Sequence, residues 1–155
     1  MNKYDEAMKL LDEKFGHRDG LISLSTIDQT ANAEGKCIPA ARIVNAYYED
    51  GAFYTVTYAT ATKMLQIAQN PEVAVCVIVD NFTANGIGEN LGWVCDEKNA
   101  EMMAKIRPAF AEWYNEANND EDTNTCLLRV RLTKGVWNDA HKGIRNEIDF
   151  VNKTA

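Results

Sequence analysis

The sequence predicts a mainly β protein with added helices, a small antiparallel barrel of six to seven strands. Three observations support this fold class: about six short segments with strand character, turn residues between them, and helix-forming segments at the N-terminus, in the middle and in the second half. No repeat, low-complexity run or Pro/Gly-rich linker divides residues 1–155, so we expect one domain.

The first element predicted is a helix over residues 2–15. Its apolar residues recur at helical spacing and form one stripe, at Tyr4, Ala7, Met8, Leu11 and Phe15. Asn2 is suited to cap its start and Gly16 to end it. We expect the apolar stripe to lie over the barrel.

The next segments predict three strands. Residues 20–27 alternate in polarity, and the polar residues 28–35 are interpreted as a plain connection to a second strand that includes residues 41–48. Asp50-Gly51 predicts a tight hairpin turn, because Gly tolerates the positive φ that two-residue turns require. Residues 53–58 then alternate, which places Phe53, Thr55 and Thr57 on one face and the intervening residues on the other.

A short helix and an apolar strand follow. Thr60 or Thr62 is suited to cap the helix, and Asn70-Pro71 ends it, because Pro disfavours helical geometry in the residue before it. Residues 73–79 are apolar without alternation, which is typical of a strand covered on both faces. A second copy of the chain or the N-terminal helix would supply the outer cover.

The second half predicts a glycine-rich strand, a long helical segment and two later strands. Residues 80–92 begin with a turn, and the glycines of their strand indicate a bulge or a barrel corner. Residues 96–117 are helical, with a kink or break expected at Arg107 because Pro108 follows it. Residues 126–132 alternate as a strand, Lys134-Gly135 is expected to turn, and a short last strand is expected to start at Val136-Trp137.

Composition excludes several classes of function. The net charge of −7 argues against a general nucleic-acid surface, which requires a basic face. The N-terminal stretch lacks the apolar core of a signal peptide and no run is long enough to span a bilayer, so we expect a cytoplasmic protein with no membrane partner. The four cysteines form no C-x-x-C pair and the two histidines have no metal-ligand spacing, so neither disulfides nor a metal site is expected.

Two cations form the candidate site, one at each end of the unit made of the hairpin around Asp50-Gly51 and the short helix that follows it. Arg42 lies on its first strand and Lys63 in the first turn of its helix. A lysine there opposes the helix dipole, but a cation beside hydroxyls and free backbone N–H groups is what an anion such as phosphate needs. The alternative is a solvated Lys63 and a surface ion pair for Arg42.

The ordered motifs around these cations resemble one known family. Pro39-Ala40-Ala41-Arg42-Ile43-Val44, then Asp50-Gly51, Tyr54-Thr55-Val56-Thr57, Lys63 and Asn70-Pro71-Glu72-Val73-Ala74-Val75 resemble the pyridoxamine 5′-phosphate oxidase-like, FMN-binding split-barrel proteins. The resemblance covers roughly residues 21–132.

The resemblance implies a flavin site and a homodimer. It implies that Arg42, Lys63 and Thr62 contact the phosphate of FMN, and that Ile43, Val44, Asn45, Val56 and Thr57 line the ring and ribityl chain. In this family the flavin lies at an interface between two chains. The protein would supply binding and electrostatics while the cofactor supplies the redox chemistry on a small-molecule substrate or electron acceptor.

One departure bears on the substrate. The pyridoxamine phosphate oxidases end in a basic and aromatic segment, whereas residues 143–150 here are short and acidic. The chain therefore looks more like the short general-stress or flavin-reductase-like members than like a true pyridoxamine phosphate oxidase.

The catalytic role stays open. No residue pattern identifies a catalytic residue, and nothing in the sequence positions His17 or His141 beside a nucleophile. Trp137 is interpreted as a core or interface residue, with contact to the flavin as the alternative. The alternatives to an oxidoreductase are a non-catalytic module that stores or senses flavin, and a deazaflavin or haem binder on the same scaffold.

Overall fold

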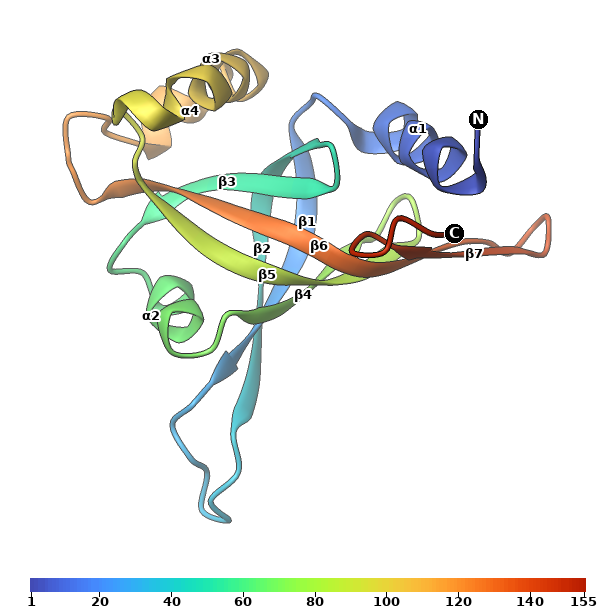
Figure 1. Cartoon of the computed structure of the whole chain (residues 1–155). Coiled ribbons are helices and arrows are strands. Elements are labelled where there is room, and N and C mark those ends of the chain that lie inside the picture. Colours follow the sequence, from blue (N-terminus) through green and yellow to red (C-terminus); the bar gives the residue numbers. More distant parts are fainter.

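The strands form one antiparallel sheet that closes on itself (Figure 1). In this computed structural model, which describes all of residues 1–155, the strand order is β3-β2-β1-β4-β5-β6-β7, and an additional pairing of β3 with β6 closes the first six strands into a barrel. The strands are β1 (Gly20–Asp28), β2 (Ile38–Glu49), β3 (Ala52–Tyr58), β4 (Glu72–Val77), β5 (Phe82–Trp93), β6 (Thr125–Asp139) and β7 (Ile144–Asp149). The predicted fold class is confirmed.

Four helices accompany the barrel. They are α1 (Lys3–Phe15), α2 (Thr62–Gln69), α3 (Ala100–Ala109) and α4 (Tyr114–Ala117), with a 3₁₀ turn η1 (Glu97–Asn99) before α3. The side chain of Asn2 accepts a hydrogen bond from the N–H of Asp5, so the predicted cap of α1 is confirmed. The expected break in the third helical segment is also present, although it follows Ala109 and does not lie at Arg107.

The hairpin turn and the core agree with the predicted pattern. Asp50 and Gly51 both have positive φ, 46° and 78°, as a two-residue hairpin turn requires. Leu11 and Phe15 of α1 join the larger core cluster inside the barrel, where the Phe15 ring lies 5.7 Å from Phe53 and 5.4 Å from Phe82 between centroids. Trp137 belongs to the same cluster and is 9% exposed, which supports its interpretation as a core residue.

A second, smaller cluster lies between the barrel and the helices α3 and α4. Tyr47 of β2 and Leu127 of β6 meet Met103, Ile106 and Phe110 there. The methionine and aromatic residues of this segment are thus core residues, because each of these three side chains is fully buried.

The predicted turn at Lys134-Gly135 is wrong. The single strand β6 runs through both residues, and its second half pairs with β7, which is the true last strand. Gly135 serves close packing here: a Cβ at this position would lie 2.9 Å from the ring of Phe82. The register shift between Asn90 and Trp93 places an extra residue in β5 beside Gly92, which has a positive φ of 85°, and so confirms the bulge predicted for the glycine-rich strand.

The N-terminal helix does not cover the outer face of the apolar strand, and cover by a second copy of the chain stays a prediction. Val73, Val75 and Val77 of β4 are buried inside the barrel, whereas Ala74 and Cys76 on its outer face are only half-buried. The run also ends as a strand at Val77, so Ile78 and Val79 lie in the following turn, where Val79 is 94% exposed.

A carboxylate with two arginines holds β5 against β6. Glu89 accepts hydrogen bonds from Arg129 Nη2 at 2.6 Å and from Arg131 Nε at 3.0 Å. The bond from Arg129 is the main cause that lowers the pKa of Glu89 below its ordinary value. A carboxyl group with a lowered folded-state pKa adds stability above its ordinary pKa, and this stability is lost as the pH falls through the folded-state value.

We therefore expect Glu89→Gln to lower the free energy of unfolding at pH 7 by about 1 kcal/mol, since the cluster is partly exposed. The difference from wild type should shrink once the pH falls below the ordinary carboxyl value of about 4. Urea unfolding at pH 7 and pH 3 measures both quantities. Glu147→Gln, which removes an exposed pair with Arg145, is the matched control. A difference from wild type that does not change between the two pH values would contradict the argument.

Candidate functional site

The barrel wall opens between β2 and β3, and the predicted site residues lie around this opening. The two strands pair only where Tyr47–Glu49 meets Ala52–Tyr54, next to the hairpin turn. Beyond these residues β2 continues to pair with β1, and β3 with β6, so the facing edges of β2 and β3 have no strand partner. One link crosses the opening, where the hydroxyl of Thr55 donates to the carbonyl oxygen of Asn45 at 2.7 Å.

Arg42 lies on β2 beside this opening, and neutral groups hold its guanidinium. Nη1 donates to Thr26 Oγ1 at 2.6 Å and to the carbonyl oxygen of Leu24 at 3.3 Å, and Nη2 donates to Gln66 Oε1 at 3.0 Å. Arg42 forms no ion pair, so the predicted alternative of a surface ion pair is not what the structure contains. Burial lowers the pKa of the guanidinium from its ordinary value.

Lys63 lies on α2 close to Arg42 and also lacks an acidic partner. Gln66, which binds Arg42, stands one turn after Lys63, and residues at this spacing are neighbours on a helix surface. Burial, and after it the positive charge of Arg42, lowers the pKa of Lys63. In a chain with 23 acidic residues, two adjacent, partly buried cations without a carboxylate make a local positive centre.

The start of α2 adds backbone donors to this centre. Its cap residue is Ala61, with no side-chain hydrogen bond, so the prediction that Thr60 or Thr62 caps the helix is wrong. Thr62 is the exposed first residue of α2, and the first turn contains no acidic residue. Because nothing caps this turn, its N–H groups and the positive end of the helix dipole have no anionic partner within the chain.

The other predicted site residues divide between two faces of the strands. Val44 packs against the barrel core, whereas Ile43 is 57% exposed on the opposite face and Asn45 donates to Asp19. On β3, Thr57 is buried opposite Cys126, and Val56 packs on the outer cluster under α3 and α4. The strand alternation therefore brings Arg42, Val44 and Thr57 to one side and leaves Ile43, Asn45 and Val56 on the other.

Three further residues at the opening were not predicted as site residues: Thr26, Gln66 and Cys126. Burial raises the pKa of the Cys126 thiol, and the charge of Lys63 opposes this shift. Gln66 had a weak signal in the sequence, because it follows Lys63 by three residues on a predicted helix. Thr26 lies 16 residues from Arg42, and only the pairing of β1 with β2 brings the two together.

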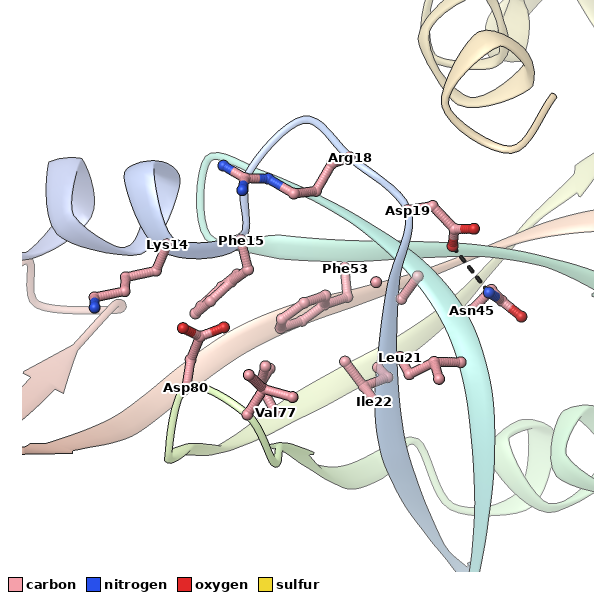
Figure 2. Close-up of a pocket in the computed structure, with 13 residues that line it drawn as sticks. Lys14, Phe15, Arg18, Asp19, Leu21, Ile22, Asn45, Phe53, Val77 and Asp80 are labelled. Carbon is pink, nitrogen blue, oxygen red and sulfur yellow. Dashed lines mark hydrogen bonds between the residues drawn. The ribbon is translucent and has the colours of Figure 1, made fainter. Parts of the chain in front are cut away.

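A separate cavity lies at the opposite end of the β1–β2 pair, against α1 (Figure 2). Its volume is about 430 Å³, and its apolar floor is formed by Phe15, Ile22, Phe53 and Val77. It exists because β1 pairs with β4 only at Ser23–Ser25, so the two strands separate toward α1. Among the predicted site residues only Asn45 lines it, and Figure 2 shows the Asn45 amide directed to Asp19.

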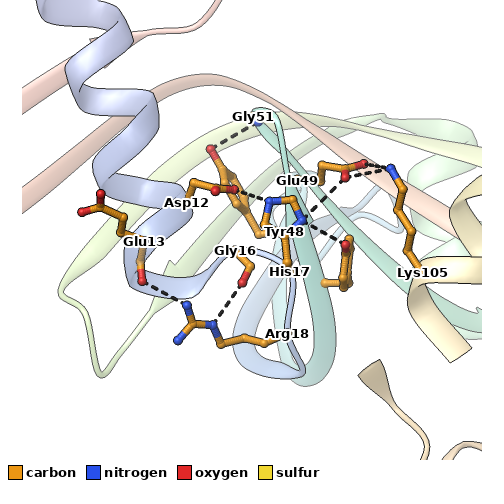
Figure 3. Close-up of polar contacts among 10 residues, drawn as sticks. Asp12, Glu13, Gly16, His17, Arg18, Tyr48, Glu49, Gly51 and Lys105 are labelled. Carbon is orange, nitrogen blue, oxygen red and sulfur yellow. Dashed lines mark hydrogen bonds and ion pairs between the residues drawn. The ribbon is translucent and has the colours of Figure 1, made fainter. Parts of the chain in front are cut away.

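His17 is held in a polar cluster that joins α1, β2 and α3 (Figure 3). Its Nε2 lies 2.6 Å from Asp12 Oδ1 and its Nδ1 lies 3.1 Å from the Tyr47 hydroxyl, while Lys105 binds the neighbouring Glu49 at 2.8 Å. The cluster contains no Ser or Cys beside the imidazole, so it does not form a nucleophilic triad. No group of three or more His, Cys, Asp or Glu side chains is arranged to hold a metal ion.

The six-stranded barrel, which the pairing of β3 with β6 closes, has the fold of solved pyridoxamine 5′-phosphate oxidase-related proteins. Among solved structures, General Stress Protein 26 from Bacillus anthracis matches with a TM-score of 0.63 at 16% identity over 91% of this chain and 98% of the other. A pyridoxamine 5′-phosphate oxidase-related, FMN binding protein from Nostoc punctiforme matches with a TM-score of 0.59 at 15% identity over 95% of this chain and 89% of the other.

The same fold also occurs in a protein described by a different cofactor. A heme binding protein from Mycobacterium smegmatis matches with a TM-score of 0.67 at 14% identity, over 99% of this chain and 60% of the other. No protein-family model and no curated protein sequence matches the chain. At sequence identities of 14–16%, the likeness to the solved structures establishes the fold.

None of the helices is sufficiently long and apolar to pass through a lipid bilayer.

Proposed function

We propose that this protein is an FMN-binding, oxidoreductase-like split barrel whose flavin phosphate is held between Arg42 and Lys63. The observation that carries the proposal is the pair of adjacent, partly buried cations that have no carboxylate partner in a strongly acidic chain. Such a pair is electrostatically unfavourable by itself and becomes favourable when a dianionic group binds to both. A structural neighbour that is described as FMN binding supports the choice of this ligand.

Thr62 and the backbone edges of β2 and β3 would complete such a site, whereas the side chains of Ile43, Asn45 and Val56 lie on the other face of the strands. Thr62 and the uncapped first turn of α2 add a hydroxyl and N–H donors next to Lys63. The unpaired edges of β2 at residues 43–45 and of β3 at residues 56–57 present backbone donors and acceptors that would orient the polar edge of a ring. When bound, FMN would supply hydride or electron transfer, and the chain's own groups would bind and orient it.

We further propose that the chain works as a homodimer on a small-molecule substrate or electron acceptor. Leu21 and Ile43 are diagonal neighbours on the outer face of the β1–β2 pair, and both side chains are more than half exposed beside the candidate site. Ala74 and Cys76 leave the outer face of β4 partly uncovered as well. A second copy would cover such apolar positions, and light scattering of the purified protein measures whether it is present.

The absorbance spectrum of the purified protein tests the cofactor. We expect bands of oxidised flavin at about one flavin per chain, and mass spectrometry of the released cofactor separates FMN from deazaflavin and haem. A colourless preparation that binds no added FMN would overturn the proposal. Steady-state oxidation of NAD(P)H then separates an oxidoreductase from a module that only stores or senses flavin.

A further inference from the structure

The residues that contact the Arg42 guanidinium from inside the barrel share one property: all of them are neutral. Thr26 of β1 and Gln66 of α2 each accept a hydrogen bond from one of its terminal nitrogens. The hydroxyl of Thr26 also donates to Gln66 Oε1, so the three side chains form a closed set of mutual hydrogen bonds. A closed set of this kind restricts the guanidinium to one orientation.

Both acceptors are buried. Thr26 is 2% exposed and Gln66 is 8% exposed, although threonine and glutamine are usually found at the surface. Buried polar groups are stabilised only when hydrogen-bonded, and for Gln66 Oε1 both partners are Arg42 and Thr26. The contacts with Arg42 therefore explain why these two polar residues occupy the interior.

The absence of charge on Thr26 and Gln66 also matters for ligand binding. An aspartate or glutamate at either position would orient Arg42 equally well, but it would also form an ion pair and offset the positive charge. Threonine and glutamine orient the guanidinium and leave its charge available to a ligand. Because Gln66 and Lys63 are on the same short helix, the bond from Arg42 to Gln66 also sets the position of Lys63 relative to Arg42.

We propose that Thr26 and Gln66 are positioning residues that hold Arg42 for phosphate binding without neutralising it. The inference rests on the proposed function, in which Arg42 and Lys63 bind the flavin phosphate. It adds that the affinity of the site for the phosphate group depends on an uncharged residue at position 66.

The test is Gln66→Glu, which keeps the size of the side chain and places a carboxylate beside the guanidinium. Affinities for FMN and for riboflavin, which lacks the phosphate, are measured by quenching of flavin fluorescence. We expect the preference for FMN over riboflavin to fall by about tenfold or more, the loss of one charge-assisted contact, while riboflavin binding and the thermal midpoint stay near wild type.

Two comparisons separate positioning from a general effect on folding or charge. Gln69→Glu makes the same charge change at an exposed position of α2 and should alter both affinities by less than about twofold. Thr26→Val should reduce the preference for FMN over riboflavin, whereas Thr26→Ser, which keeps the hydroxyl, should retain it.

The outcomes are distinguishable. If wild-type protein prefers FMN and Gln66→Glu keeps that preference unchanged, the requirement for a neutral residue at position 66 is wrong and the proposed function stands. Wild-type protein that binds FMN no more tightly than riboflavin overturns the phosphate site itself, and the role of Gln66 with it. If Gln66→Glu does not fold, the contrast between Thr26→Val and Thr26→Ser decides, and equal FMN preference in both contradicts the inference.

Discussion

Replacing Arg42 and Lys63 together by alanine is expected to raise the dissociation constant for FMN by at least about 100-fold. A hydrogen bond to a charged group contributes roughly 1.5–3 kcal/mol, so the loss of two such contacts corresponds to roughly 3–6 kcal/mol. The effect is large because both substitutions remove a cation that has no carboxylate partner and would contact the same phosphate. Titration of the apoprotein with FMN, followed by flavin fluorescence, gives both dissociation constants.

The matched control removes the same charge elsewhere. Lys142 lies in the turn between β6 and β7 and Arg145 near the start of β7, where both are exposed and each forms a surface ion pair. Lys142→Ala combined with Arg145→Ala should leave FMN affinity within about twofold, because exposed charges far from the site are screened by salt. If both double variants weaken FMN binding equally, the change in net charge causes the effect, and Arg42 and Lys63 do not form the phosphate site.

Phe82→Ala is expected to be the most destabilising single substitution considered. Phe82 is fully buried at the start of β5, in contact with Phe15 of α1 and adjacent to the backbone of Gly135 in β6. Its removal would leave a cavity where α1, β5 and β6 meet, and such substitutions cost about 3–5 kcal/mol. Urea unfolding measures the loss, which for a chain of this size corresponds to a fall in Tm of about 10 °C.

A neighbouring apolar residue supplies the comparison for Phe82. Val79 lies three residues earlier but is 94% exposed, so Val79→Ala should change the free energy of unfolding by less than about 0.5 kcal/mol. Similar losses for the two variants would contradict the assignment of Phe82 to the junction between α1 and the barrel.

Local patterns explain how much of the fold was predictable. The Asp50-Gly51 turn follows from the φ angles that the two residues tolerate, and the bounds of α1 follow from its cap and its apolar stripe. The same local logic fails at Lys134-Gly135, because Gly135 is required by the approach of the Phe82 ring from another strand. It also fails at Thr62, since the candidate cap residue lies inside the helix and not before it.

The amino-acid sequence by itself determined the class of fold and the two cations of the candidate site. Alternation, turn residues and ordered motifs are local patterns, which can be recognised without knowing which distant segments meet. Only the tertiary structure decided that Arg42 meets neutral partners. Thr26 and Gln66 are 40 positions apart in the sequence and come from a strand and a helix. Closure of the barrel brings them together, and burial then requires each of these polar groups to find a hydrogen-bond partner.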